Sequence, residues 1–131
     1  YRLLVSSYPN SEYVDDAREN MRLANDQLAG KEMSVGRYYL GNGQYTAAIN
    51  RFRTVVEDFQ TSSHIAEALY RLTEAYLKLG LLGEAQSAAA VLGLNYPSST
   101  WYEKSYALLQ QQGLLPQSVA GNWITASSQL T

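Results

Sequence analysis

Residues 39–48, YLGNGQYTAA, are matched 37 residues later by residues 76–85, YLKLGLLGEA. Both stretches hold tyrosine, glycine and alanine at the same three places: Tyr39, Gly43 and Ala48 in the first, and Tyr76, Gly80 and Ala85 in the second. A period in the mid-thirties with large and small residues at set positions is typical of stacked helical hairpins of the tetratricopeptide type. The repeat therefore predicts an all-α fold, a tetratricopeptide-like right-handed superhelix of antiparallel helix pairs.

A second signal recurs at the end of each predicted hairpin. Residues 59–62 read FQTS, residues 96–99 read YPSS with Pro97, and residues 8–11 read YPNS. Proline disfavours helix in the residue before it, and serine suits the first position of a helix. These signals predict helices at about residues 2–7, 11–40, 44–59, 64–79, 82–95 and 99–112, within a repeat domain of residues 1–112.

The predicted helix of residues 11–40 contains Gly30, which could break it, but the apolar pattern continues beyond this glycine. Leu28 is one of the apolar positions that follow three- and four-residue steps along this helix, and Leu79 is expected to face inward from the helix at residues 64–79. Residues 113–131 are expected to form a tail with little regular structure. Within that tail, Trp123 and Ile124 either anchor on the last helix pair or form part of an exposed binding site.

The repeat positions indicate how neighbouring helices meet. Small residues let two helices approach closely, and we expect this of Gly36 with Ala48, and of Thr73 with Ala85. Large residues fill the gaps between hairpins, and we assign this role to Tyr39 and Tyr76, while Phe52 is expected in the core. Gly43 and Gly80 suit the left-handed conformation that ends a helix.

Composition excludes several classes of function. The chain has 10 Lys and Arg against 12 Asp and Glu, so it lacks the clustered basic face of a nucleic-acid-binding protein. It has no cysteine and a single histidine, His64, for which a solvated helix-cap role is expected. No apolar run approaches the ~20 residues of a membrane span. We therefore expect no enzyme activity, no metal or other cofactor, no nucleic acid partner and no membrane span in this chain, which we interpret as part of a longer protein.

Asn50 and Arg51 fall on the predicted solvent side of the helix at residues 44–59, and Arg51 and Arg53 flank the core residue Phe52. An exposed arginine on a scaffold helix can pair with a carboxylate in two-point geometry. It can equally be an ordinary solubilising residue. The residues alone leave both interpretations open.

Three stretches resemble the C-terminal half of the BamD family, the tetratricopeptide lipoproteins of the outer-membrane β-barrel assembly machinery of Gram-negative bacteria. They are residues 8–23 with the pattern YPNS-x-Y-x-x-DA, residues 28–39 with LA-x-x-E-x-x-V-x-x-YY, and residues 45–51 with Y-x-AA-x-NR. The resemblance is strongest over residues 4–82. It looks loose after Pro97 and does not extend to the tail.

The resemblance implies a non-enzymatic scaffold on the periplasmic side of the outer membrane, in a full protein anchored by lipid. It implies docking on the periplasmic domain of the barrel subunit BamA, with other assembly lipoproteins and unfolded outer-membrane proteins as further partners. Asn50 and Arg51 match a family position tied to that docking, with Arg53 and Tyr39 as helpers. Two alternatives remain: another periplasmic repeat adaptor, such as the envelope-division coordinator, and a helical glycan hydrolase, for which no paired acids are evident.

Overall fold

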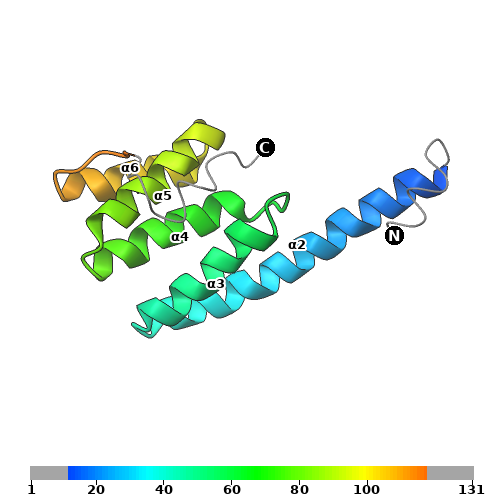
Figure 1. Ribbon diagram of the computed structural model, residues 1–131, viewed down its shortest axis with the longest axis horizontal. Coiled ribbons are helices and arrows are strands. Elements are labelled where there is room, and N and C mark those ends of the chain that lie inside the picture. Colours follow the sequence, from blue (N-terminus) through cyan, green and yellow to red (C-terminus); the bar gives the residue numbers. More distant parts are fainter. Residues whose placement is uncertain (1–11, 118–131) are drawn as a thin grey trace.

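The computed structural model describes residues 12–117, which form five α-helices and no strand. Figure 1 shows them as successive hairpins stacked side by side. The helices are α2 (Glu12–Gly41), α3 (Tyr45–Asp58), α4 (Ile65–Lys78), α5 (Leu82–Asn95) and α6 (Thr100–Gln111). The predicted all-α, tetratricopeptide-like fold is confirmed. The expected helix at residues 2–7, and Trp123 and Ile124, lie outside the described residues.

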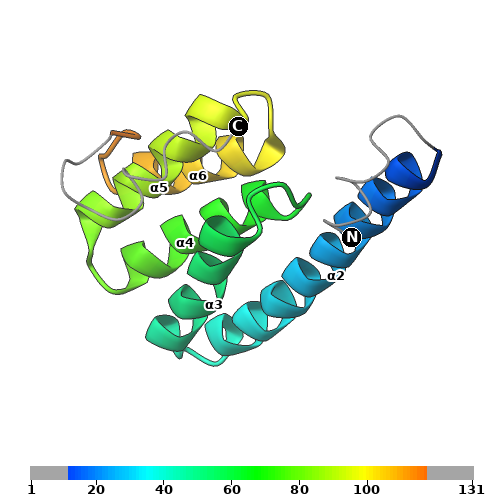
Figure 2. The same ribbon diagram turned by 45° about the vertical axis from the view of Figure 1, so that its right-hand side comes forward.

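Helix α2 is one uninterrupted helix of 30 residues, and Gly30 lies within it. Its C-terminal half packs on α3, whereas its N-terminal half extends beyond the other described helices (Figures 1 and 2). Leu28 belongs to the apolar pattern of this helix, yet its side chain is 52% exposed. Spacing along a helix shows which residues share a face, but not how far the neighbouring helix reaches.

The helices pack in the order that a stack of hairpins requires. Helix α3 lies between α2 and α4, α5 pairs with α4, and α6 packs on both α4 and α5. Each helix buries one side in a single core, as neighbouring repeats do for one another. The largest fully buried side chains of that core are Phe52, Met33, Ile65, Leu69, Leu72, Leu92 and Leu109.

Three glycines end helices in the same way. Gly43, Gly80 and Gly113 have φ values of +76°, +77° and +73°. In each case the next residue donates its backbone N–H to the carbonyl five residues back, as Gln44 does to Tyr39 at 2.9 Å. This is the Schellman arrangement, which needs a left-handed residue and therefore favours glycine. Gly113 shows that α6 ends as α2 and α4 do.

The small and large residues of the first hairpin interlock. A Cβ atom on Gly36 would lie 2.6 Å from the Phe52 ring, which is fully buried, and Ala48 is fully buried beside them. The second hairpin buries Thr73 and Ala85, with Tyr76 only 5% exposed. Sequence reasoning missed a third close approach, in which a Cβ atom on Gly93 would lie 2.6 Å from Tyr102 of α6.

Two further expectations need correction. Leu79 is exposed at the turn after α4 instead of facing inward. His64 is the N-cap residue of α4, but its side chain makes no capping hydrogen bond and is partly buried, with its ring against Gly30 of α2. Both residues stand at the end of a helix, where the direction of the side chain depends on the loop as well as on helical spacing.

Capping and the last described segment complete the fold. Ser99 caps α6 by accepting a hydrogen bond from the backbone N–H of Trp101. Beyond α6 the chain runs without helix or strand along α5, where Gln86 donates from its side chain to the carbonyl of Leu115 at 3.0 Å. None of the five helices is both long enough and apolar enough to cross a membrane.

Candidate docking surface

A hollow of about 290 Å³ opens on the outer side of the first hairpin, between the end of α2 and the middle of α3. It brings together three of the four residues that the sequence singled out for partner binding: Tyr39, Asn50 and Arg51. The remaining lining residues are Ala47 and Thr54. We call these five residues the Arg51 surface.

Helical geometry explains why this stripe of α3 faces outward. Ala47, Arg51 and Thr54 are four and three residues apart, so they lie on one side of the helix. The buried residues Ala48, Ile49, Phe52, Val55 and Val56 occupy the other side. Thr54 donates its hydroxyl to the backbone carbonyl of Asn50 at 2.9 Å, and Asn50 itself is exposed.

Arg51 is held by an acid from the neighbouring helix. Its Nη1 lies 3.2 Å from Oε2 of Glu32, and the two side chains are 44% and 25% exposed. Glu32 belongs to the family-like stretch of α2 that also contains Tyr39. The pair limits the rotamers of Arg51 while much of its guanidinium remains open to solvent. A guanidinium offers several N–H donors, so a second carboxylate can still bind beside Glu32.

Arg53 does not belong to this hollow. It forms an ion pair with Glu57, four residues along α3, and both side chains are more than two-fifths exposed. An exposed pair at this spacing is ordinary for a helix surface and contributes only a few tenths of a kcal/mol. The helper role predicted for Arg53 therefore has no support from its position.

Tyr38 is a further residue of this region that we had not selected from the sequence. Its side chain is 66% exposed and packs edge-on against Tyr39, with the ring centroids 5.9 Å apart. Tyrosine is enriched among the few residues that carry most of the binding energy of protein interfaces. The sequence signal for Tyr38 was the pair of consecutive tyrosines near the end of this helix. Neighbouring residues of a helix point in different directions, so both rings cannot be buried.

Several other charged side chains of the described residues pair with a neighbour on their own helix. On the exposed part of α2, a hydrogen bond from Arg22 to Glu19 raises the pKa of the guanidinium. Residues 12–117 contain no group of three His, Asp or Glu side chains that could hold a metal ion.

Comparison with known proteins identifies the family of this chain. The YfiO family model, described as outer membrane lipoprotein, matches residues 1–92. The outer membrane protein assembly factor BamD of Caulobacter vibrioides is 56% identical over 115 residues, which cover 88% of this chain and 38% of that protein. BamD of Rickettsia prowazekii is 48% identical over 107 residues, covering 82% and 43%. BamD of Neisseria meningitidis serogroup A is 42% identical over 96 residues, covering 73% and 36%.

The chain therefore spans about two-fifths of the length of the curated relatives that it matches. The family match includes the whole of α2, α3 and α4, and thus every residue of the Arg51 surface. The chain belongs to the YfiO family of outer membrane lipoproteins, the family of its BamD relatives.

Proposed function

We propose that this chain is a non-enzymatic scaffold segment of an outer membrane protein assembly factor. In this proposal the Arg51 surface docks on the periplasmic domain of the barrel subunit BamA. The family is one of outer membrane lipoproteins, so the chain lies at the outer membrane, on its periplasmic side. Other assembly lipoproteins and unfolded outer-membrane proteins are further proposed partners. Family membership favours this role over that of the envelope-division coordinator.

The observation that supports the proposal is the environment of Arg51. Glu32 orients the guanidinium of Arg51, and the Arg51 side chain is 44% exposed. It lies beside Tyr39 and Asn50. Interfaces draw most of their binding energy from a few such residues, arginine and tyrosine above all. An acidic side chain of the partner would enter the hollow, pair with the free side of the guanidinium and accept a hydrogen bond from the Asn50 amide.

The test measures binding of the 131-residue chain to the purified periplasmic domain of BamA by isothermal titration calorimetry. Arg51→Gln is expected to weaken binding about tenfold or more, because it removes one member of a desolvated charge pair. We prefer it to Arg51→Glu, which would also set a second carboxylate against Glu32. The loss of an exposed ion pair is worth at most about 1 kcal/mol, so the melting temperature should fall by no more than roughly 5 °C.

Arg53→Gln is the matched control. It removes an arginine from the same helix, with a similar exposed ion pair, but outside the hollow. Its affinity for the periplasmic domain should stay within twofold of that of the unmodified chain. Equal losses for Arg51→Gln and Arg53→Gln would mean that general positive charge, and not the Arg51 surface, supports binding.

A further inference from the structure

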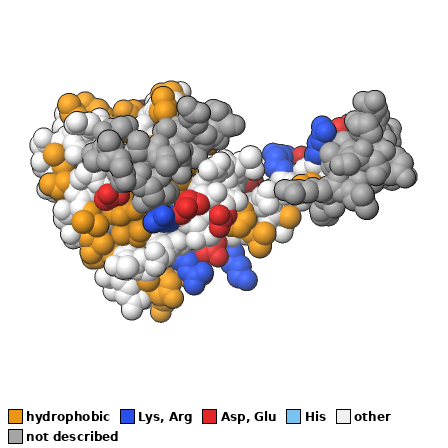
Figure 3. Space-filling model, in the orientation of Figure 1, with side chains coloured by type: hydrophobic (Ala, Val, Ile, Leu, Met, Phe, Trp, Pro, Cys, Tyr) orange, Lys and Arg blue, Asp and Glu red, His pale blue; other side chains and the backbone are white. Residues whose placement is uncertain are grey.

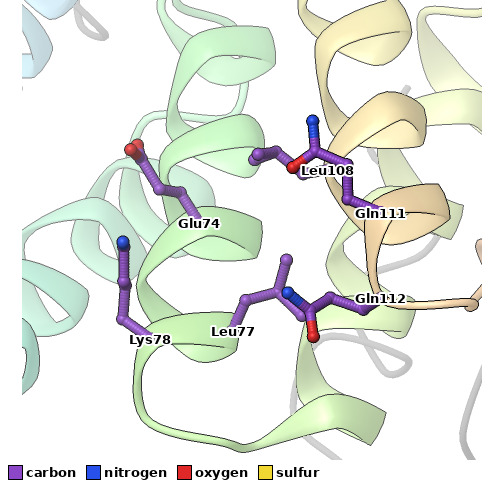
Figure 4. A pocket seen from close by; sticks show the side chains of 6 residues that line it. All are labelled: Glu74, Leu77, Lys78, Leu108, Gln111 and Gln112. Atoms are coloured by element: carbon purple, nitrogen blue, oxygen red, sulfur yellow. The ribbon is translucent and has the colours of Figure 1, made fainter.

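Three chain segments that end or join helices lie along one edge of the array. They are the turn between α2 and α3, the turn between α4 and α5, and the end of α6, and they follow one another along one side of the array in both Figure 1 and Figure 2. Helices α4 and α6 end next to one another, since Lys78 and Gln112 line the same hollow of about 190 Å³ (Figure 4). The loops before α4 and α6 lie on the other side of the array.

Exposed leucines gather at this edge. Leu79, Leu81 and Leu82 occupy the turn between α4 and α5, and their exposed fractions are 42%, 46% and 43%. Leu115, which is 56% exposed, joins them from beyond α6, because its carbonyl accepts a hydrogen bond from the side chain of Gln86, one helical turn along α5 from Leu82. We call these four leucines the leucine edge. Figure 3 shows hydrophobic side chains along this side of the molecule.

The sequence around this edge is free of charge. Residues 38–50, 79–83 and 105–117 contain no Asp, Glu, Lys or Arg, although charged residues make up 17% of the chain. The nearest cation in the sequence is Lys78, which is exposed and directly precedes Leu79. Single exposed leucines are ordinary, but an exposed apolar patch marks a site of contact with a protein or a membrane. The leucine edge is such a patch.

Composition and position favour a lipid surface over a protein partner. Residues 79–83 and 111–115 include no arginine and no aromatic residue, the types that dominate the binding energy of protein interfaces. Leucines on a turn at the edge of the array can enter the boundary between headgroups and acyl chains without a matching pocket, while a neighbouring lysine keeps its ammonium group among the headgroups. The family is one of outer membrane lipoproteins, so a bilayer surface is close to this chain.

We propose that the leucine edge rests on the surface of a phospholipid bilayer, with its leucines at the boundary of the acyl chains and Lys78 among anionic headgroups. The contact stays at the membrane surface and holds the array of helices in one orientation toward the bilayer. The leucine edge shares no residue with the Arg51 surface, and this proposal does not depend on the docking proposed for that surface.

The test measures how much of the 131-residue chain floats with vesicles in a density gradient, over a range of lipid concentrations. The vesicles contain three parts phosphatidylethanolamine to one part phosphatidylglycerol. The triple variant Leu79→Gln, Leu81→Gln and Leu82→Gln should weaken binding by about tenfold or more, because full burial of one leucine favours its transfer from water by more than about tenfold and each of these is nearly half exposed. Vesicles of phosphatidylcholine, which have no net charge, should show the same loss.

The matched control removes three leucines that are more exposed but lie away from the leucine edge: Leu23→Gln, Leu28→Gln and Leu94→Gln. Leu23 and Leu28 belong to the first half of α2, and Leu94 lies at the far end of α5 from Leu82. Binding of this control to both kinds of vesicle should stay within twofold of that of the unmodified chain. Both triple variants change only exposed side chains, so they should melt near its temperature. Leu81→Gln alone, the smallest change at the edge, should still weaken binding about threefold.

Four results would each overturn the proposal. They are no binding of the unmodified chain to either kind of vesicle, unchanged binding of the edge variant, equal losses in the two triple variants, and a loss that appears only with the BamA periplasmic domain. The last result would assign the leucine edge to a protein partner. The titrations of Arg51→Gln and Arg53→Gln do not depend on any of these outcomes.

Discussion

The close approach of Gly36 to Phe52 makes a quantitative prediction about the first hairpin. In Gly36→Ala the new Cβ would lie 2.6 Å from one carbon of the ring and 2.9 Å from the next. The ring is fully buried, so α2 and α3 must move apart. We expect this overpacking to lower the free energy of unfolding by about 3 kcal/mol, the upper end of the usual range for added methyl groups in a core. The better helix propensity of alanine offsets about 1 kcal/mol, which leaves a net loss of about 2 kcal/mol.

Thermal unfolding followed by circular dichroism measures this loss, which corresponds to a fall in melting temperature of roughly 8 °C. Gly41→Ala is the control on the same helix, because nothing lies within 4 Å of its Cβ and its φ is not positive. It should be neutral or slightly stabilising. Adding Phe52→Leu to Gly36→Ala should recover part of the loss, since the two changes share one contact. Equal melting temperatures for Gly36→Ala and Gly41→Ala would refute the interlocked packing.

Two further predictions concern the joint between hairpins and the response to alkali. Asp26→Ala should lower the free energy of unfolding by about 1 kcal/mol in urea denaturation. Asp26 accepts one hydrogen bond from the backbone N–H of Ser63 at 2.9 Å and another from its hydroxyl at 3.2 Å, and the variant removes both. An unchanged free energy would mean that this contact does not join α2 to the loop before α4. Burial, reinforced by Glu74, raises the pKa of Tyr70 above its ordinary value of about 10. The folded chain therefore keeps a proton that the unfolded chain gives up, so stability should fall as pH rises above 10. Tyr70→Phe should reduce that fall between pH 9 and 11 in melting experiments, and an unchanged slope would exclude this contribution.

The turns and caps of the fold were predictable from local chemistry. Gly43 and Gly80 mark helix ends because the left-handed conformation favours glycine. Either Ser98 or Ser99 was expected to cap the last helix, and Ser99 does so by accepting a hydrogen bond from a backbone N–H. The repeat positions likewise followed from a fixed period. The exposure of Leu28 did not follow, because periodicity orients a residue on its own helix and says nothing of where the partner helix ends.

The candidate site was only partly predictable, because helical spacing orients a residue on its own helix and does not show which residues of other helices it meets. Helical spacing was enough to place Asn50 and Arg51 on the outside of α3, and the family resemblance directed attention to them. The contact between Arg51 and Glu32 joins residues 19 positions apart on two helices, so it depends on tertiary packing. The close approaches at Gly30 and Gly93 also involve other helices or loops, and a glycine inside a helix does not reveal its neighbour.

The most direct test of the docking claim exchanges the charges of the ion pair between Arg51 and Glu32. Glu32→Arg combined with Arg51→Glu keeps an ion pair between α2 and α3, so the melting temperature should stay within a few degrees of that of the unmodified chain. It also places a carboxylate where the partner's acid would approach. We predict that calorimetric titration with the BamA periplasmic domain shows binding weakened by about a hundredfold or abolished. Unchanged affinity in the charge-exchanged chain would contradict docking through Arg51.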